Sequence, residues 1–199
     1  MDRIEKILRD QREELLSTDF SQFVPRQEEQ EIDLNSRLAQ IVIGVRRCGK
    51  STLCQKVLFQ SNVQFAYVNF DDETLSSLQS TQLNDILEML YRIYGTFTHL
   101  FMDEIQNVPS WHLFVNRLMR QGIHLVLTGS NANLLSGELS THLTGRYNEI
   151  RLFPFSFAEY CQAKGIATDA LTTKSSGLLL HALDTYLMHG GFPETLTMS

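Results

Sequence analysis

The sequence predicts an α/β fold in which short buried strands alternate with amphipathic helices. Apolar runs of strand length occur at residues 41–43, 100–102 and 125–127, and each is followed by polar or glycine residues. Helical stripes of apolar residues separate these runs, as at residues 83–93. This alternation is typical of a sheet covered by helices. The 199 residues, 43% hydrophobic and 20% charged, are enough for one sizeable domain.

The chain is organised around residues 41–52, which read IVIGVRRCGKST. Gly44 through Ser51 fits G-x-x-x-x-G-K-[ST], the phosphate-binding loop called Walker A. A plain glycine-rich turn is the alternative. The context disfavours it, because an apolar run precedes the loop and a helical pattern follows it. The loop residues expected to contact a nucleotide are Gly44, Val45, Arg46, Arg47, Cys48, Gly49, Lys50, Ser51 and Thr52.

Each residue type in this loop has a chemical reason. We expect Gly44 and Gly49 to adopt positive φ and to admit a phosphate without an obstructing Cβ. The loop amides and the N-terminus of the next helix then face the anion. Lys50 places a cation against the β- and γ-phosphates, and the Ser51 hydroxyl is a hard oxygen ligand for Mg²⁺.

A second motif follows about fifty residues later, where residues 100–102 lead into Asp103 and Glu104. A buried strand that ends in two carboxylates is the Walker B pattern of nucleotide hydrolases. We expect Asp103 to hold Mg²⁺, mostly through water, and Glu104 to act as the general base on the attacking water. The alternative is a strand that ends in two solvated acids, and the upstream loop disfavours it.

Polar residues also end two other strands. Residues 71–73 (Asp-Asp-Glu) either orient water near Mg²⁺ or cap the following turn, and the sequence favours neither. Residues 128–131 (Thr-Gly-Ser-Asn) would lie between the two motifs, where a side chain would contact the γ-phosphate; simple turn chemistry is the alternative. Arg146 is either a surface arginine or a finger that completes a neighbouring subunit's site.

The remaining elements follow from periodicity and turn signals. Pro25 marks a bend near Val24 and Arg26, which are candidates for lining a base pocket. The expected helices are residues 2–16, 27–38, 81–94, 108–121, 134–143, 155–164 and 178–188. The other expected strands are residues 64–70, 122–130 and 147–153, and residues 165–176 are expected to form a polar loop.

Composition narrows the functional classes. The formal net charge of −6 argues against a module that coats nucleic acid. The three cysteines are odd in number and match no metal spacing, and a disulfide at Cys48 would obstruct the phosphate loop. We therefore expect a reduced, cytoplasmic protein. Neither a secretory pattern nor an apolar run of ~18 residues is present, so we expect no membrane segment.

The motifs, taken in order, resemble the AAA+ superfamily. The blocks are VPR at residues 24–26, GVRRCGKST, YVNFDDE, LFMDEIQNV, LTGSN, LLSGELSTHLTGR and LFPFSFAEY. They are similar to prokaryotic AAA-type ATP-binding proteins in which an AAA domain precedes a domain of unknown function, whose start YLMHGGFPE resembles.

The resemblance implies a P-loop NTPase three-layer sandwich with a parallel five-stranded sheet of order 5-1-4-3-2. It places Asn131 at the position that senses the γ-phosphate, with Ser130 as its neighbour, and Arg146 at the arginine-finger position. It divides the chain into an N-terminal helical segment (residues 1–38), an ATPase core (39–153) and the start of a truncated C-terminal helical region (154–199). No convincing sensor-2 arginine follows the last strand, which departs from the usual AAA+ pattern.

The function implied is Mg²⁺-dependent ATP binding and hydrolysis that drives a conformational change in an attached domain or partner, with a homo-oligomer as one expected state. The alternative is a nucleotide-binding switch or scaffold with little turnover, against which Glu104 argues. A small-molecule kinase is disfavoured by the Walker B glutamate and by the polar end of the 122–130 strand. A nucleic-acid motor stays open.

Overall fold

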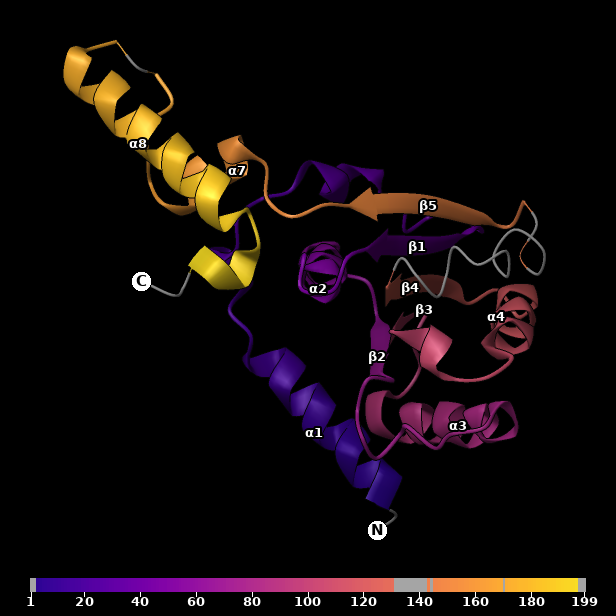
Figure 1. The fold of residues 1–199 in the computed structure, drawn as a ribbon. Helices are drawn as coiled ribbons and strands as arrows, with labels where there is room; N and C mark the ends of the chain where they lie inside the picture. The colour runs from indigo at the N-terminus through magenta and orange to yellow at the C-terminus, as the bar shows by residue number, and fades with distance from the viewer. Residues whose placement is uncertain (1–2, 131–142, 144, 170, 197–199) are drawn as a thin grey trace.

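The computed structural model describes residues 3–130, 143, 145–169 and 171–196. Its core is one sheet of five strands in the order β2-β3-β4-β1-β5, and every neighbouring pair is parallel (Figure 1). This is the predicted order read from the opposite edge, so the predicted fold class is confirmed. The strands are β1 (Ala39–Gly44), β2 (Phe65–Asn69), β3 (His99–Asp103), β4 (His124–Ser130) and β5 (Tyr147–Leu152).

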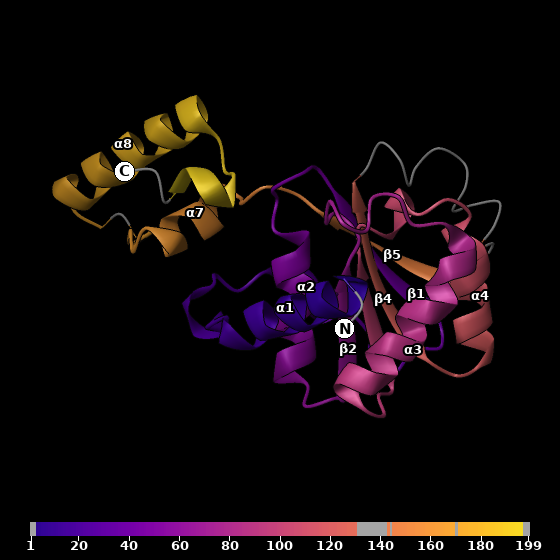
Figure 2. The same ribbon diagram turned by 90° about the horizontal axis from the view of Figure 1, so that it is seen from below.

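Helices cover both faces of the sheet. α3 (Leu83–Tyr94) and α4 (Trp111–Arg120) lie on one face, and α2 (Lys50–Gln60) lies on the other (Figure 2). The alternation of side chains along β1 explains this arrangement. Ile41 and Ile43 are buried in the core under α3 and α4, whereas Val42 is buried in the core under α2. The result is a three-layer domain.

The N-terminal helix α1 (Arg3–Ser17) covers the free edge of the sheet. It packs against α3 and β2, and its Leu8 is fully buried. The Gln11 amide donates to the Asn69 carbonyl oxygen at 3.0 Å and accepts from the Asn69 amide at 3.0 Å. A side chain thereby satisfies edge-strand groups that would otherwise be unpaired.

The predicted acidic helix at residues 27–38 is wrong. Only a short 3-10 turn, η2 (Gln27–Glu31), forms there. The Asp33 carboxylate accepts from the Asn35 amide at 3.0 Å, and the Ser36 hydroxyl accepts from the Leu38 amide at 3.1 Å. Such local bonds from side chain to backbone compete with helix formation, so the chain turns directly into β1.

A C-terminal helical unit follows β5. It consists of α7 (Phe157–Ala163), α8 (Thr173–His189) and the 3-10 helix η5 (Pro193–Leu196), and α8 extends away from the sheet (Figures 1 and 2). The predicted loop at residues 165–176 is too long, because a capping box at Thr172 starts α8 at residue 173. The predicted helix at residues 134–143 lies largely outside the described residues.

The other 3-10 turns are η1 (Phe20–Gln22), η3 (Ser80–Gln82) and η4 (Ile105–Asn107). Trp111 of α4 is 2% exposed and lies in the core. Within the part of the chain that the structure describes, no helix has both the length and the apolar character needed to cross a bilayer.

Candidate functional site

The glycine-rich loop connects the end of β1 at Gly44 to the start of α2 at Lys50. Gly49 has a φ of 98°, as expected for a position that only glycine adopts without strain. Gly44 does not have positive φ, so that expectation is wrong. Its lack of a Cβ is required for packing, because a Cβ there would lie 2.2 Å from the Leu152 carbonyl oxygen of β5.

The sheet brings the acid pair to the same edge as the loop. Asp103 ends β3, and β3 is separated from β1 only by β4. Strand ends of a parallel sheet meet at one edge, and that edge is where ligands bind in α/β folds. A cavity of about 640 Å³ opens there. It is lined by Phe23, Arg46, Arg47, Gly49, Lys50, Ser51, Thr52, Asn69, Asp71, Asp103, Glu104, Pro193 and Glu194.

The Lys50 ammonium and the Glu104 carboxylate meet inside this cavity. Lys50 Nζ lies 3.3 Å from Glu104 Oε1 and donates to the carbonyl oxygens of Gly44 and Val45, each at 3.3 Å. Lys50 is 4% exposed. Glu104 itself has a φ of 52°, in the left-handed region that non-glycine residues rarely adopt. Such backbone strain is typical of functional positions.

The Thr128 hydroxyl connects the two acidic residues. Thr128 is fully buried on β4; its Oγ1 donates to Asp103 Oδ1 and accepts from the Glu104 amide at 3.0 Å. The Ser130 amide donates to Glu104 Oε2 at 3.2 Å, and the Gln106 side chain donates to the same oxygen. The polar residues that end this strand therefore hold the acid pair, a role that sequence reasoning missed.

Burial sets the electrostatics of Asp103, which is 2% exposed. Removal from water raises the pKa of this carboxyl, and hydrogen bonds from the Ser51 and Thr128 side chains oppose the shift. Asp103 and Ser51 both line the cavity, which places a carboxylate and a hydroxyl together at the phosphate loop.

The acids that follow β2 take different roles. Asp72 accepts from the Thr74 amide at 2.8 Å and caps a turn. Asp71 lines the cavity, where its Oδ2 lies 2.8 Å from the Arg46 guanidinium, and its other oxygen accepts from Asn107 at 3.4 Å. The turn-capping alternative holds for Asp72.

A smaller cavity of about 70 Å³ adjoins the loop. Its walls are formed by Phe23, Val24, Arg26, Glu29, Cys48, Gly49, Thr52, Leu53, Lys56, Phe155 and Pro193. The two candidates for a base pocket, Val24 and Arg26, both lie here. Cys48 is fully buried with its Sγ 3.5 Å from the Leu152 carbonyl oxygen, and burial raises the pKa of its thiol. Sequence analysis did not assign Pro193 to this site. The Gly-Gly-Phe-Pro run at residues 190–193 is the sequence feature that could have pointed to it.

The remaining candidates are Asn131 and Arg146. Asn131 lies outside the described residues. Arg146 is exposed just before β5, and its carbonyl oxygen accepts from the Ala39 amide at 3.0 Å, at the start of β1. Arg146 therefore lies at the amino ends of the strands, whereas the phosphate loop lies at their carboxyl ends. It lines a separate cavity with Arg117 and Arg120.

Comparison with known proteins decides the family. Residues 36–161 match the profile described as AAA domain. The chain belongs to the AAA-type ATPase family. The matched range begins just before β1 of this AAA domain, includes the phosphate loop and the acid pair, and ends in α7.

Curated relatives of the AAA domain extend well beyond it. An uncharacterized protein of Methanocaldococcus jannaschii is 35% identical over 166 residues, which is 82% of this chain and 37% of that protein. An uncharacterized protein of Haemophilus influenzae is 34% identical over 165 residues, which is 79% of this chain and 40% of that protein. The chain thus spans about two fifths of the length of these relatives.

Solved structures with little sequence identity share the fold. The Walker-type ATPase of Pyrococcus abyssi has a TM-score of 0.56 at 18% identity, covering 87% of this chain and 65% of its own. AMPPCP-bound DnaA from Aquifex aeolicus has a TM-score of 0.55 at 11% identity, covering 89% and 61%.

Proposed function

We propose that this AAA domain binds ATP with Mg²⁺ in the 640 Å³ cavity and hydrolyses it. The observation that carries the proposal is the convergence of Lys50, Ser51, Asp103 and Glu104 on one cavity at the carboxyl edge of the sheet. The phosphate loop and the N-terminus of α2 supply amides for the phosphates, and Lys50 supplies the cation.

The residues present fit a magnesium ion. Mg²⁺ prefers oxygen ligands and is commonly held by one or two protein oxygens together with substrate phosphates and water. The Ser51 hydroxyl and the Asp103 carboxylate provide such oxygens in the lining of one cavity. The bound ion would neutralise charge on the phosphoryl oxygens. Thr128 would keep the Asp103 carboxylate oriented toward it.

Glu104 is the proposed general base. Its Oε2 is held by the Ser130 amide and by Gln106, and its Oε1 faces the Lys50 ammonium, so the carboxylate has a fixed orientation at the cavity. A positioned carboxylate takes the proton of the attacking water as that water adds to the γ-phosphate. Asn131 is proposed to position this water, and Arg146 to complete the site of a neighbouring copy in a homo-oligomer.

The 70 Å³ cavity is the proposed entrance to the base pocket. Val24, Phe155 and Pro193 offer apolar surface for an aromatic ring beside the phosphate loop. Its walls come from three parts of the chain, the N-terminal segment (residues 1–38), the core (39–153) and the C-terminal region (154–199). Binding there would shift these parts relative to one another, which is the proposed mechanical output.

A nucleotide switch with little turnover is the second candidate. The observation that favours it is the ion pair between Lys50 and Glu104, because a carboxylate oxygen held by a lysine is not free to contact the attacking water. Comparing ATP binding with ATP turnover separates the two candidates.

Titration calorimetry with Mg²⁺-ATP tests the site. Lys50→Met should weaken binding by about tenfold or more, because it removes a buried cation from the phosphates. Lys174→Met, an exposed lysine on α8, is the matched control and should bind like wild type. Equal affinity for wild type and Lys50→Met, or no binding by wild type, would refute the proposal.

A further inference from the structure

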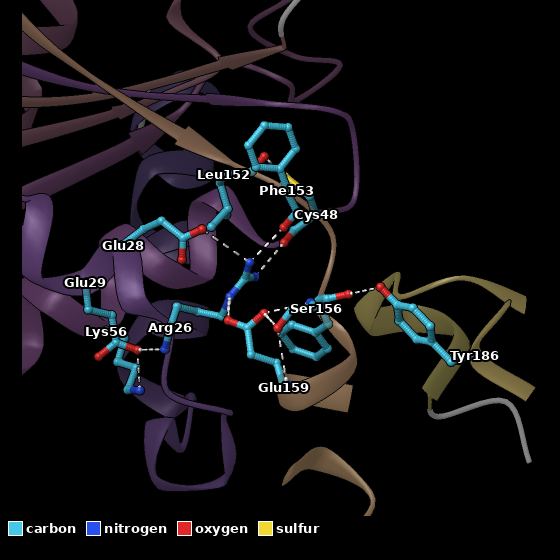
Figure 3. A network of polar contacts seen from close by, with 11 residues as sticks. Arg26, Glu28, Glu29, Cys48, Lys56, Leu152, Phe153, Ser156, Glu159 and Tyr186 are labelled. Carbon is cyan, nitrogen blue, oxygen red and sulfur yellow. Dashed lines mark hydrogen bonds and ion pairs between the residues drawn. The ribbon is translucent and has the colours of Figure 1, made fainter. Parts of the chain in front are cut away.

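The Arg26 guanidinium connects the N-terminal segment to the phosphate loop and to residues 153–159, which are far apart in the sequence. Its Nε donates to Glu159 Oε1 at 2.6 Å, its Nη1 to the Cys48 carbonyl oxygen at 3.3 Å, and its Nη2 to the Phe153 carbonyl oxygen at 2.7 Å (Figure 3). The Phe155 ring lies 4.9 Å from the guanidinium carbon. Arg26 is only 9% exposed.

These partners belong to different structural units. Cys48 lies in the phosphate loop, Phe153 follows β5, and Glu159 lies in the first turn of α7. A buried charge is costly unless it is paired and hydrogen-bonded. A planar guanidinium can donate in three directions at once, which a lysine ammonium on a flexible stem does not reproduce. The arrangement therefore depends on arginine.

The C-terminal helical unit also makes hydrogen bonds to Phe155, which lies in the segment that Arg26 contacts. The Phe155 amide donates to the Gly191 carbonyl oxygen at 2.7 Å, and the Tyr186 hydroxyl donates to the Phe155 carbonyl oxygen at 2.8 Å. Gly191 is packed so closely that a Cβ there would lie 2.1 Å from the Phe155 carbonyl oxygen. Residues 153–156 are thus held between Arg26 and α8.

A second contact runs from this unit back to the loop. Glu194 Oε2 of η5 lies 3.2 Å from the Arg47 guanidinium. Pro193 lines both cavities beside the loop, and Arg26 lines the smaller one. The proposed base pocket therefore has walls from the loop and from the helical unit, with Arg26 between them.

We propose that Arg26 is a positioning residue that couples the phosphate loop to the C-terminal helical unit, so that nucleotide binding and the placement of α7 and α8 influence each other. This inference rests on the proposed nucleotide site. A ligand that moves the Cys48 carbonyl changes the bonds that Arg26 makes to Glu159, and the coupling is reciprocal. Arg26 acts through its protein partners rather than by contact with the phosphates.

The test uses Glu159→Gln and a matched control, Ser156→Ala. The Glu159 carboxylate accepts from Arg26 with one oxygen and from the Ser156 amide and hydroxyl with the other. Glutamine has a single acceptor oxygen, which can keep the α7 cap but then turns an amide group toward Arg26. Ser156→Ala instead removes a capping hydroxyl and leaves the arginine bond intact.

Hydrogen–deuterium exchange of the nucleotide-free protein is the first readout. Glu159→Gln should raise exchange of the peptide covering residues 44–52 by about threefold or more, although the substitution is on α7. Ser156→Ala should raise exchange only around residues 157–163. Arg26→Lys is the second variant and should raise exchange in both regions. A loop unaffected by Glu159→Gln, or equally affected by Ser156→Ala, would overturn the proposal.

Calorimetry with Mg²⁺-ATP is the second readout. Glu159→Gln should weaken ATP binding by about tenfold, because the loss of one charge-assisted bond is transmitted to the loop. Glu159 lines neither cavity in the described residues, so this loss would not come from direct contact. If wild type binds no ATP, the proposed function fails, while the exchange comparison still decides whether Arg26 links loop and helix. Unchanged affinity in Glu159→Gln would refute the coupling.

Discussion

Thr128→Val should destabilise the domain and disorganise the acid pair. Valine has nearly the shape of threonine but carries no hydroxyl, so the substitution removes two hydrogen bonds without opening a cavity. Asp103 Oδ1 loses the bond donated by Thr128, and the Glu104 amide loses its 3.0 Å acceptor. Thr128 is fully buried, so water cannot easily replace the hydroxyl.

The magnitude follows from these two bonds. A hydrogen bond to a charged group contributes about 1.5–3 kcal/mol, and a buried amide left without a partner costs about 1–3 kcal/mol. The added apolar burial of valine offsets about 1 kcal/mol. The expected loss of unfolding free energy is therefore about 1.5–5 kcal/mol, which corresponds to a fall in Tm of roughly 3–20 °C for a domain of this size.

Chemical denaturation of Thr128→Val and Thr128→Ser separates the hydroxyl from the methyl group. Serine keeps both hydrogen bonds and loses only a methyl, at a cost of about 1 kcal/mol. Thr128→Val should also raise the pKa of Asp103 further, because a bond that favours the carboxylate is gone. If Thr128→Val is no less stable than Thr128→Ser, the assigned role of this hydroxyl is wrong.

Three further outcomes are expected. Gly44→Ala should cost about 2 kcal/mol or more in denaturation, because its Cβ would lie 2.2 Å from the Leu152 carbonyl oxygen, whereas Gly177→Ala on α8 has open space and should be neutral or stabilising. Burial lowers the pKa of His99, so the unfolded chain binds its proton more tightly and the unfolding free energy should fall as pH drops below about 6.5. His99→Gln should flatten that dependence, and an unchanged slope would contradict it. ATPase activity per molecule should rise with protein concentration in wild type but not in Arg146→Ala, and equal concentration dependence would exclude action in trans.

The sequence predicted the parts of the site that are local in the chain. The phosphate loop occupies consecutive residues whose types are dictated by phosphate chemistry, and Asp103 and Glu104 follow a buried apolar run. The sheet order came from resemblance of the motifs to AAA+ proteins. These features need no knowledge of distant contacts.

The features that sequence missed depend on contacts between distant residues. The partners of Arg26 lie 22, 127 and 133 residues away along the chain. The sequence therefore placed Arg26 near a base pocket but gave no sign of its bond to Glu159 of α7. Thr128 was one of several polar residues expected at the end of a strand. Its hydrogen bonds to Asp103 and to the Glu104 amide become evident only when neighbouring strands are placed side by side. The acidic segment at residues 27–38 has helical composition, but the bonds made by Asp33 and Ser36 favour turns instead.

Glu104→Gln tests the central claim most directly, through parallel measurements of Mg²⁺-ATP binding and steady-state hydrolysis. Glutamine preserves the size of the side chain and removes its basicity. Our account predicts that the variant binds ATP within a few fold of wild type and loses hydrolysis by about a hundredfold or more. Equal turnover by wild type and Glu104→Gln would contradict the assignment of Glu104 as the base. ATP binding without turnover in both proteins would favour the nucleotide switch.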